Sequence, residues 1–124
     1  MNKMMTKLLF VGLGGALGAV CRYLISLLPV RGEFPVLTLL TNLGGALLIG
    51  LVVGMTGRLS QNSMLFWKSG VCGGFTTFST FSLEALRLFE GGRALLGTAY
   101  AVGSVLLCLL GVFLGECAGR RIAL

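Results

Sequence analysis

The sequence predicts an all-α membrane protein, with four transmembrane helices in a single domain that covers residues 1–124. Hydrophobic residues make up 56% of the chain and charged residues only 11%, whereas about a quarter of the residues in a soluble domain are charged. Four apolar runs have the length of about 20 residues that a helix needs to cross a bilayer. Glycines recur at a spacing of four residues, which lets membrane helices pack closely. These glycines are Gly14 and Gly18, Gly50 and Gly54, and Gly111, Gly115 and Gly119.

The first two runs are the most regular. We expect the first span at about residues 7–28, with Arg22 as the charge inside it. Pro29 ends this span, because proline has no amide hydrogen to donate to a helix. We expect the second span at about residues 36–56, which contain no charged residue.

The third run, at about residues 64–88, differs from a simple lipid-facing helix. Its middle reads GVCGGFTTFSTFS and is rich in glycine and hydroxyl residues. Because Gly73 and Gly74 weaken a helix, we expect this span to be broken near its middle. Membranes tolerate such a break where the freed backbone is buried or lines a cavity. The EGGR turn follows, and the fourth span is expected at about residues 94–115.

Four spans place both ends of the chain on one side of the membrane. The basic residues on that side would be Lys3, Lys7, Arg58, Lys68, Arg120 and Arg121, and those on the other Arg22, Arg31, Arg87 and Arg93. This weak asymmetry favours termini inside the cell. It also leaves insertion in both orientations open.

Several functions are excluded by what the sequence lacks. The net charge of +6 does not indicate nucleic-acid binding, since the basic residues are scattered and mostly stand at the ends of apolar runs. Histidine is absent, and the four cysteines form no CxxC pair, so we expect no zinc site. The chain also has no carboxylate pair and no phosphate-binding loop, which argues against an enzyme. The cysteines are Cys21, Cys72, Cys108 and Cys117.

Polar side chains inside the apolar runs are the candidate functional residues, because they are costly in a bilayer and usually line a cavity or pair with each other. Asn42 and Thr38 lie one turn apart on the second span. Asn42 fits a transport pathway and an interhelical hydrogen bond equally well. Tyr100 and Ser104 lie one turn apart on the fourth span, facing the same way.

The third run offers two further sets of candidates. Phe75, Phe78 and Phe81 recur every three residues, which would place them on one helical face between hydroxyl residues. This stripe fits either packing or a pathway. Glu84 either pairs with Arg87 one turn later or acts as a gate or proton-linked acid.

These motifs resemble the Fluc, or CrcB-type, fluoride channels. The resemblance covers nearly the whole chain and depends on GALGAVCRY at residues 15–23, TLLTNLGG at 38–45 and GGFTTFSTFSLE at 73–84. It implies a passive, fluoride-selective channel that crosses the inner (plasma) membrane of the cell several times. Such a channel exports fluoride and protects the cell against its toxicity.

The resemblance also implies a partner, an ion site and residue roles. The partner is a second copy of the chain in an antiparallel, dual-topology homodimer. Backbone carbonyls of Gly73 and Thr76 would hold a structural sodium ion at the dimer interface, and Arg22 would have a structural or vestibule role. The implied fluoride pathway consists of Asn42, Phe78, Phe81, Ser79, Thr80, Glu84, Tyr100, Ser104 and Thr38. One turn beyond Ser104 stands Cys108, a weaker donor than a hydroxyl.

The chemistry of these side chains suits an anion. The positive edge of a phenyl ring, an amide NH₂ and hydroxyl groups can replace the water around a small anion, and none of them is charged. Binding is then weak enough for the ion to leave again. The alternative function is a proton-coupled small multidrug-type transporter. Transporters of that kind centre a glutamate in the first span, where this chain has only Arg22.

Overall fold

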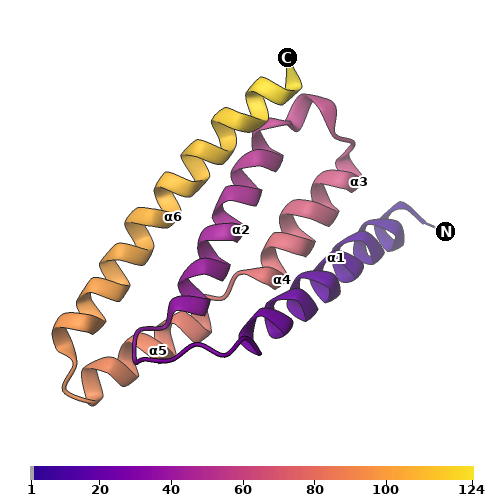
Figure 1. Cartoon of the computed structure of the whole chain (residues 1–124). Coiled ribbons are helices and arrows are strands. Elements are labelled where there is room, and N and C mark those ends of the chain that lie inside the picture. The colour runs from indigo at the N-terminus through magenta and orange to yellow at the C-terminus, as the bar shows by residue number, and fades with distance from the viewer. Residues whose placement is uncertain (1) are drawn as a thin grey trace.

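The computed structural model describes residues 2–124, and all the regular secondary structure in this part of the chain is helical. In chain order the elements are α1 (Lys3–Ser26), α2 (Val36–Gly54), η1 (Thr56–Arg58), α3 (Gln61–Met64), η2 (Leu65–Cys72), α4 (Gly73–Phe75), α5 (Phe78–Glu90) and α6 (Ala94–Ala123). Figure 1 shows the start of α1, the α2–α3 connection and the end of α6 at one end of the molecule. The α1–α2 loop and the α5–α6 turn lie at the other end.

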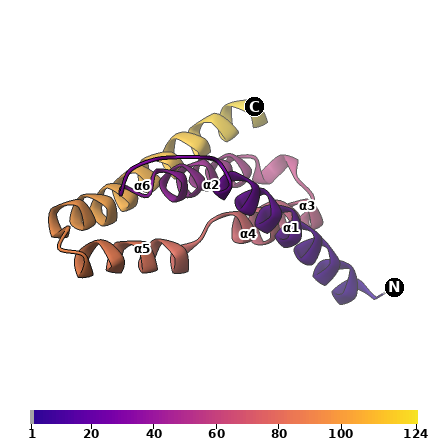
Figure 2. The ribbon, with the colours of Figure 1, turned by 60° about the horizontal axis from the view of Figure 1, so that its bottom comes forward.

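The long helices lie side by side in the order α6, α2, third segment, α1 (Figure 1). The third segment is the run of α3, η2 and α4 over residues 61–75, which continues without interruption and has π-helical geometry across η2. Beyond it the chain turns away, and α5 continues below the start of α2 and α6 (Figure 2). There α5 packs mainly on α6.

Glycines set the distance between the packed helices. A Cβ atom added to Gly119 of α6 would lie 3.0 Å from the Cα of Gly54 on α2, so the two backbones touch. On the other side, a Cβ added to Gly14 of α1 would lie 2.9 Å from the Cα of Gly70 in the third segment. The predicted role of the spaced glycines in close helix packing is therefore confirmed.

The break in the third region does not occur at its glycines. Gly73 and Gly74 are helical, and the chain becomes extended only at Thr76 (φ −80°, ψ 153°) and Thr77 (φ −143°, ψ 114°). The break is attributed to the glycines on sequence grounds, whereas the extended residues are the two threonines that follow α4. Gly74 instead lets α1 approach, since a Cβ there would lie 3.1 Å from the amide nitrogen of Ala19.

The ends of the helices also differ from the predicted spans. The first helix covers Lys3–Ser26 rather than 7–28. The last continues beyond residue 115 to Ala123, where Arg58 of η1 donates hydrogen bonds to the carbonyls of Ala123 and Leu124. These polar contacts lie at the end of α6, beyond the apolar part of the helix.

Three helices, α1, α2 and α6, are long and apolar enough to cross a membrane. Large apolar side chains cover their outward faces: Leu13 is 66% exposed, Leu109 64% and Phe113 62%. A surface of this kind is costly in water and suited to lipid. The third region has no single helix of the same kind, because of its break.

Close packing of α6 on α2 leads to a prediction for Gly115. A Cβ there would overlap the carbonyl oxygen of Leu47 and lie 3.0 Å from the amide nitrogen of Leu51, and neither backbone atom can move aside. We expect Gly115→Ala to lower the free energy of unfolding by about 1–3 kcal/mol. Thermal unfolding in detergent micelles measures the effect.

Gly103→Ala on the same helix is the matched control, because a Cβ there meets no atom within 4 Å. We expect it to change stability by less than about 1 kcal/mol. Equal effects of the two substitutions would contradict the account of the packing.

Candidate functional site

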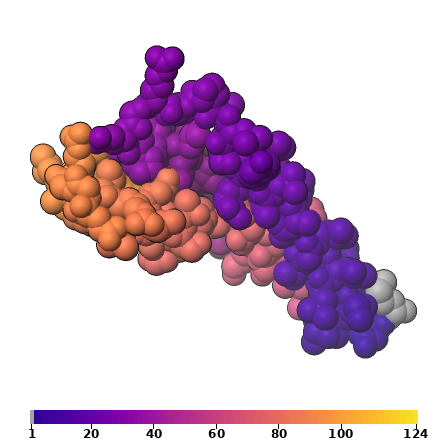
Figure 3. All heavy atoms as spheres, turned by 90° about the horizontal axis from the view of Figure 1, so that it is seen from below, coloured from indigo at the N-terminus to yellow at the C-terminus, as the bar shows by residue number. Residues whose placement is uncertain are grey.

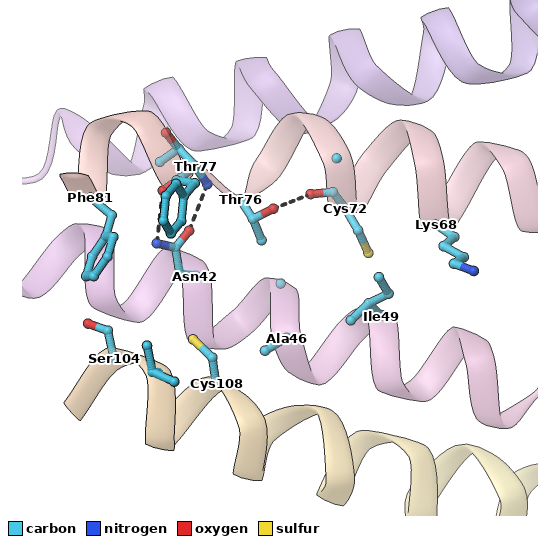
Figure 4. A pocket seen from close by; sticks show the side chains of 14 residues that line it. Asn42, Ala46, Ile49, Lys68, Cys72, Thr76, Thr77, Phe81, Ser104 and Cys108 are labelled. Atoms are coloured by element: carbon cyan, nitrogen blue, oxygen red, sulfur yellow. Dashed lines mark hydrogen bonds between the residues drawn. The ribbon is translucent and has the colours of Figure 1, made fainter. Parts of the chain in front are cut away.

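The side chain of Asn42 forms two hydrogen bonds with the extended backbone at the break in the third region. Its side-chain Oδ1 accepts a hydrogen bond from the backbone N–H of Thr77 at 2.8 Å, and its Nδ2 donates to the Thr77 carbonyl at 3.2 Å (Figure 4). One amide thus satisfies both backbone groups of a residue that has left the helix. Because an unpaired backbone group inside a membrane is costly, this pairing stabilises the extended conformation.

Two further contacts fix the ends of the half-helices on either side. Arg22 of α1 donates from Nε to the carbonyl of Gly74 at 3.1 Å, at the end of α4. The Thr77 hydroxyl accepts from the N–H of Thr80 at 3.1 Å and caps the start of α5. This hydrogen bond fits the structural role considered for Arg22, and the vestibule role stays a prediction.

A central cavity of about 380 Å³ lies beside the break, between α2, the third segment and α6 (Figure 4). Six of the predicted site residues line it: Asn42, Gly73, Thr76, Phe78, Phe81 and Ser104. Cys72, Cys108 and Lys68 line it too. Lys68 and Cys72 were not predicted as site residues. Lys68 could have been identified from the sequence, because it is a charged residue inside an apolar run.

Ser104 is the one described side chain whose buried polar atom has no hydrogen-bond partner within the chain. It is only 6% exposed, and Ser104 is one of the residues that line the central cavity, with its hydroxyl on the side of Phe81 (Figure 4). A buried hydroxyl without a partner costs about 1–3 kcal/mol. The arrangement suggests that something other than this chain supplies the partner.

A second, loop-end cavity of about 580 Å³ lies where the α1–α2 loop meets α5. It is lined by Thr38 and Glu84, together with Glu33, Arg87 and Arg93. Figure 3 views the molecule from this end, with the purple loop and the orange α5–α6 turn on either side of a hollow. Asn42, Phe78 and Phe81 thus line the central cavity, whereas Thr38 and Glu84 line the loop-end cavity.

Tyr100 lies between the two cavities and is completely buried. Its hydroxyl donates to Oε1 of Glu84 at 3.1 Å, and its ring lies 5.1 Å from that of Phe81. Arg87 pairs instead with Glu90, at 3.2 Å. The interpretation of Glu84 as a partner of Arg87 is therefore wrong in this structure.

Of the three phenylalanines predicted to share one helical face, only two belong to the same helix. Phe78 and Phe81 both belong to α5, with ring centroids 5.6 Å apart. Phe75 lies in α4, before the break, and its ring faces Gly44 and Gly45 of α2. A spacing of three residues puts side chains on one face only where the helix is continuous, so Phe75 is a packing residue.

The remaining predicted residues stand at the start of α5. Ser79 is exposed and lies 3.3 Å from the Thr77 hydroxyl, and Thr80 is half-buried behind the cap. Neither lines the central cavity or the loop-end cavity. Thr77 itself was not proposed as a site residue, although a threonine ahead of a helical pattern is a capping signal.

Residues 9–116 match the family described as "CrcB-like protein, Camphor Resistance (CrcB)". The chain belongs to this family. A "Fluoride-specific ion channel FluC" of Ruminiclostridium cellulolyticum is 43% identical over 127 residues, covering 98% of each chain. Proteins of the same name are 41% identical in Agrobacterium fabrum, over 95% of this chain and 99% of that one, and 43% identical in Cereibacter sphaeroides, over 94% and 97%.

Membership of the CrcB family makes the chain a membrane protein and not an enzyme, as predicted. The resemblance stated from the GGFTTFSTFSLE motif is confirmed. In this CrcB protein that motif spans α4, the break and the start of α5. The motif therefore contains Thr77, whose backbone forms hydrogen bonds with the Asn42 side chain.

The substitution Asn42→Ala tests whether the Asn42 side chain stabilises the extended backbone at Thr77. The substitution leaves the N–H and carbonyl of Thr77 without their partner, so we expect a loss of about 1–3 kcal/mol in stability. The more specific readout is hydrogen–deuterium exchange, in which the Thr77 amide should exchange faster.

Asn62→Ala on α3 is the matched control, because no hydrogen bond joins the Asn62 side chain to another group within residues 2–124. It should leave exchange at Thr77 unchanged. Unchanged exchange at Thr77 in Asn42→Ala would contradict the pairing.

Proposed function

We propose that this CrcB protein is a passive, fluoride-selective channel. The observation that carries the proposal is the buried Ser104 hydroxyl, which has no hydrogen-bond partner within the described chain and belongs to a residue that lines the central cavity. Asn42 and Phe81 line the same cavity. The relatives named as fluoride-specific channels, which align over nearly their whole length, support the choice of ion.

The chemistry of the site favours a small anion that hydrogen-bonds strongly. A hydroxyl and a phenyl-ring edge donate partial positive charge without carrying a full charge. Tyr100 continues this line toward Glu84 and the loop-end cavity. Lys68 is the one charged residue among the described residues that line the central cavity, and the other groups that the ion meets there are neutral. Binding to neutral groups is weak enough for the ion to leave, which conduction requires.

The third crossing of the membrane is made by the two half-helices together, with the break at Thr76 and Thr77 inside the bilayer. Non-helical backbone at that depth is tolerated where it is paired or lines a cavity, and here it does both. With α1, α2 and α6, the chain then crosses four times.

A second copy of the chain, inserted in the opposite orientation, completes the pathway. Phe78 is 77% exposed in the isolated chain, although it lines the central cavity. An antiparallel homodimer buries this ring, and the weak asymmetry of basic residues allows insertion both ways. A C-terminal tag should then be accessible from both faces of the membrane, and labelling from one face alone would contradict the dimer.

A structural sodium ion fits the backbone near the break. The N–H of Thr77 donates to Asn42, so the helical bond from this N–H to the Gly73 carbonyl is not made. That carbonyl, with the carbonyl of Thr76, is a suitable ligand for a hard cation. When bound at the dimer interface, the ion would supply a positive charge that holds the two copies together.

Export of fluoride that has accumulated in the cell follows from passive conduction across the inner (plasma) membrane, and it would protect the cell. Liposomes containing the purified protein test the proposal. We expect fluoride efflux without chloride efflux, since chloride is larger and a weaker hydrogen-bond acceptor. No efflux of either ion, or equal efflux of both, would contradict it.

Ser104→Ala is the corresponding mutation. A hydrogen bond to an ion is worth about 1.5–3 kcal/mol, so we expect fluoride flux to fall roughly tenfold or more. Thr98→Ala removes an exposed hydroxyl from the same helix and should leave flux unchanged. If Ser104→Ala conducts as well as Thr98→Ala, the Ser104 hydroxyl does not contact the ion.

A further inference from the structure

We infer that Phe34, in the loop between α1 and α2, is a positioning residue that orients the Tyr100 hydroxyl toward Glu84. The inference deepens the proposed function, because it assigns the loop a role at one end of the pathway. The orientation itself can be measured whether or not the chain conducts fluoride.

The loop is anchored next to Phe34. Glu33 forms a bidentate pair with Arg93, which precedes α6: the distances are 2.8 Å from Nε to Oε2 and 2.9 Å from an NH₂ nitrogen to Oε1. Both side chains are more than half exposed, at 55% and 57%. An exposed pair of this kind stabilises only weakly, so it directs the loop to the start of α6 rather than fixing the buried ring.

Phe34 makes the buried contact. Its ring lies edge-on to the ring of Tyr100, with centroids 5.4 Å apart and planes at 79°. This T-shaped geometry is the one that aromatic pairs prefer. Phe34 also packs against the core cluster formed by Ala85, Leu88 and Tyr100. The loop thus contributes a side chain to the packing around the buried tyrosine.

Tyr100 is held by aromatic rings from two directions. Phe81 of α5 contacts it at 5.1 Å and 54°, and Phe34 contacts it from the loop. With both contacts in place, the ring has little freedom to tilt, and its hydroxyl stays 3.1 Å from the Glu84 carboxylate. Because hydrogen bonds weaken steeply as their angle departs from linear, loss of one ring contact should disturb this bond.

The same contacts connect the loop to the central cavity. Ring contacts continue from Phe34 to Tyr100, from Tyr100 to Phe81 and from Phe81 to Phe78. Phe78 and Phe81 line the central cavity, while Phe34 lines the loop-end cavity. Phe34 therefore lies at the outer end of a continuous aromatic row, in which Tyr100 carries the polar group.

A spectroscopic measurement separates orientation from general packing. Tyr23 and Tyr100 are the two tyrosines of the chain, so Tyr23→Phe leaves Tyr100 as the single reporter. With ¹³C at the Cζ atom of tyrosine, the NMR shift of the phenol carbon reports the hydrogen bond of the hydroxyl. We expect Phe34→Ala to move or broaden this signal, and Phe34→Leu, which keeps most of the volume but no ring edge, to do the same.

Phe113→Ala is the control, because Phe113 is 62% exposed on α6 and far along the helix from Tyr100. It should leave the phenol signal unchanged. A phenol signal that is the same in Phe34→Ala, Phe34→Leu and the parent protein would overturn the inference.

Fluoride efflux then tests whether orientation matters for transport. We expect Phe34→Ala to lower flux roughly two- to tenfold, the range that corresponds to one aromatic contact. In a Tyr100→Phe background the same substitution should have no further effect, since there is no hydroxyl left to orient. An equal loss in both backgrounds would show that Phe34 acts by packing alone and would overturn the inference. A parent protein without flux would contradict the proposed function and leave the NMR result to decide the role of Phe34.

Discussion

The hydrogen-bonded pair between the Asn42 amide and the backbone of Thr77 is the interaction on which the rest of the site depends. A membrane helix can break only where its freed backbone groups find partners, and here one side chain of α2 supplies two of them. The break turns α5 away from the line of the third segment. As a result Phe78 and Phe81 face the central cavity, and Glu84 reaches Tyr100. Without this pair, a continuous helix would present the same residues in different directions.

The close contacts at glycines fix the positions of the helices around the Asn42–Thr77 pair. Lipid supplies no hydrophobic force between helices, so membrane helices depend on tight packing and on hydrogen bonds between them. Gly74 allows α1 to approach the end of α4, which puts Arg22 within 3.1 Å of the Gly74 carbonyl. Packing and hydrogen bonding therefore act at the same place. The apolar outer surface and the polar break follow from one arrangement of helices.

Much of this arrangement can be predicted from the sequence, and the exceptions have physical reasons. Length and hydropathy locate α1, α2 and α6, because lipid imposes a minimum apolar length. The position of the break could not be predicted from glycine content, since glycine serves close packing here and the partner of the freed backbone, Asn42, is distant in the sequence. The sequence leaves Asn42 open between a pathway and an interhelical bond, and the structure shows that it forms the bond while lining the cavity. Phe34 was missed because nothing in a short loop indicates which buried ring it contacts.

The central claim is that a pathway lined mainly by neutral groups conducts fluoride passively and excludes larger anions. The most direct measurement is the reversal potential of the purified protein in a planar bilayer, with a tenfold fluoride gradient, chloride as the balancing anion and equal sodium on both sides. The account predicts a reversal potential close to the Nernst value for fluoride, about 59 mV, that does not change when a pH gradient is added. A reversal potential near zero, or one that follows the pH gradient, would contradict it.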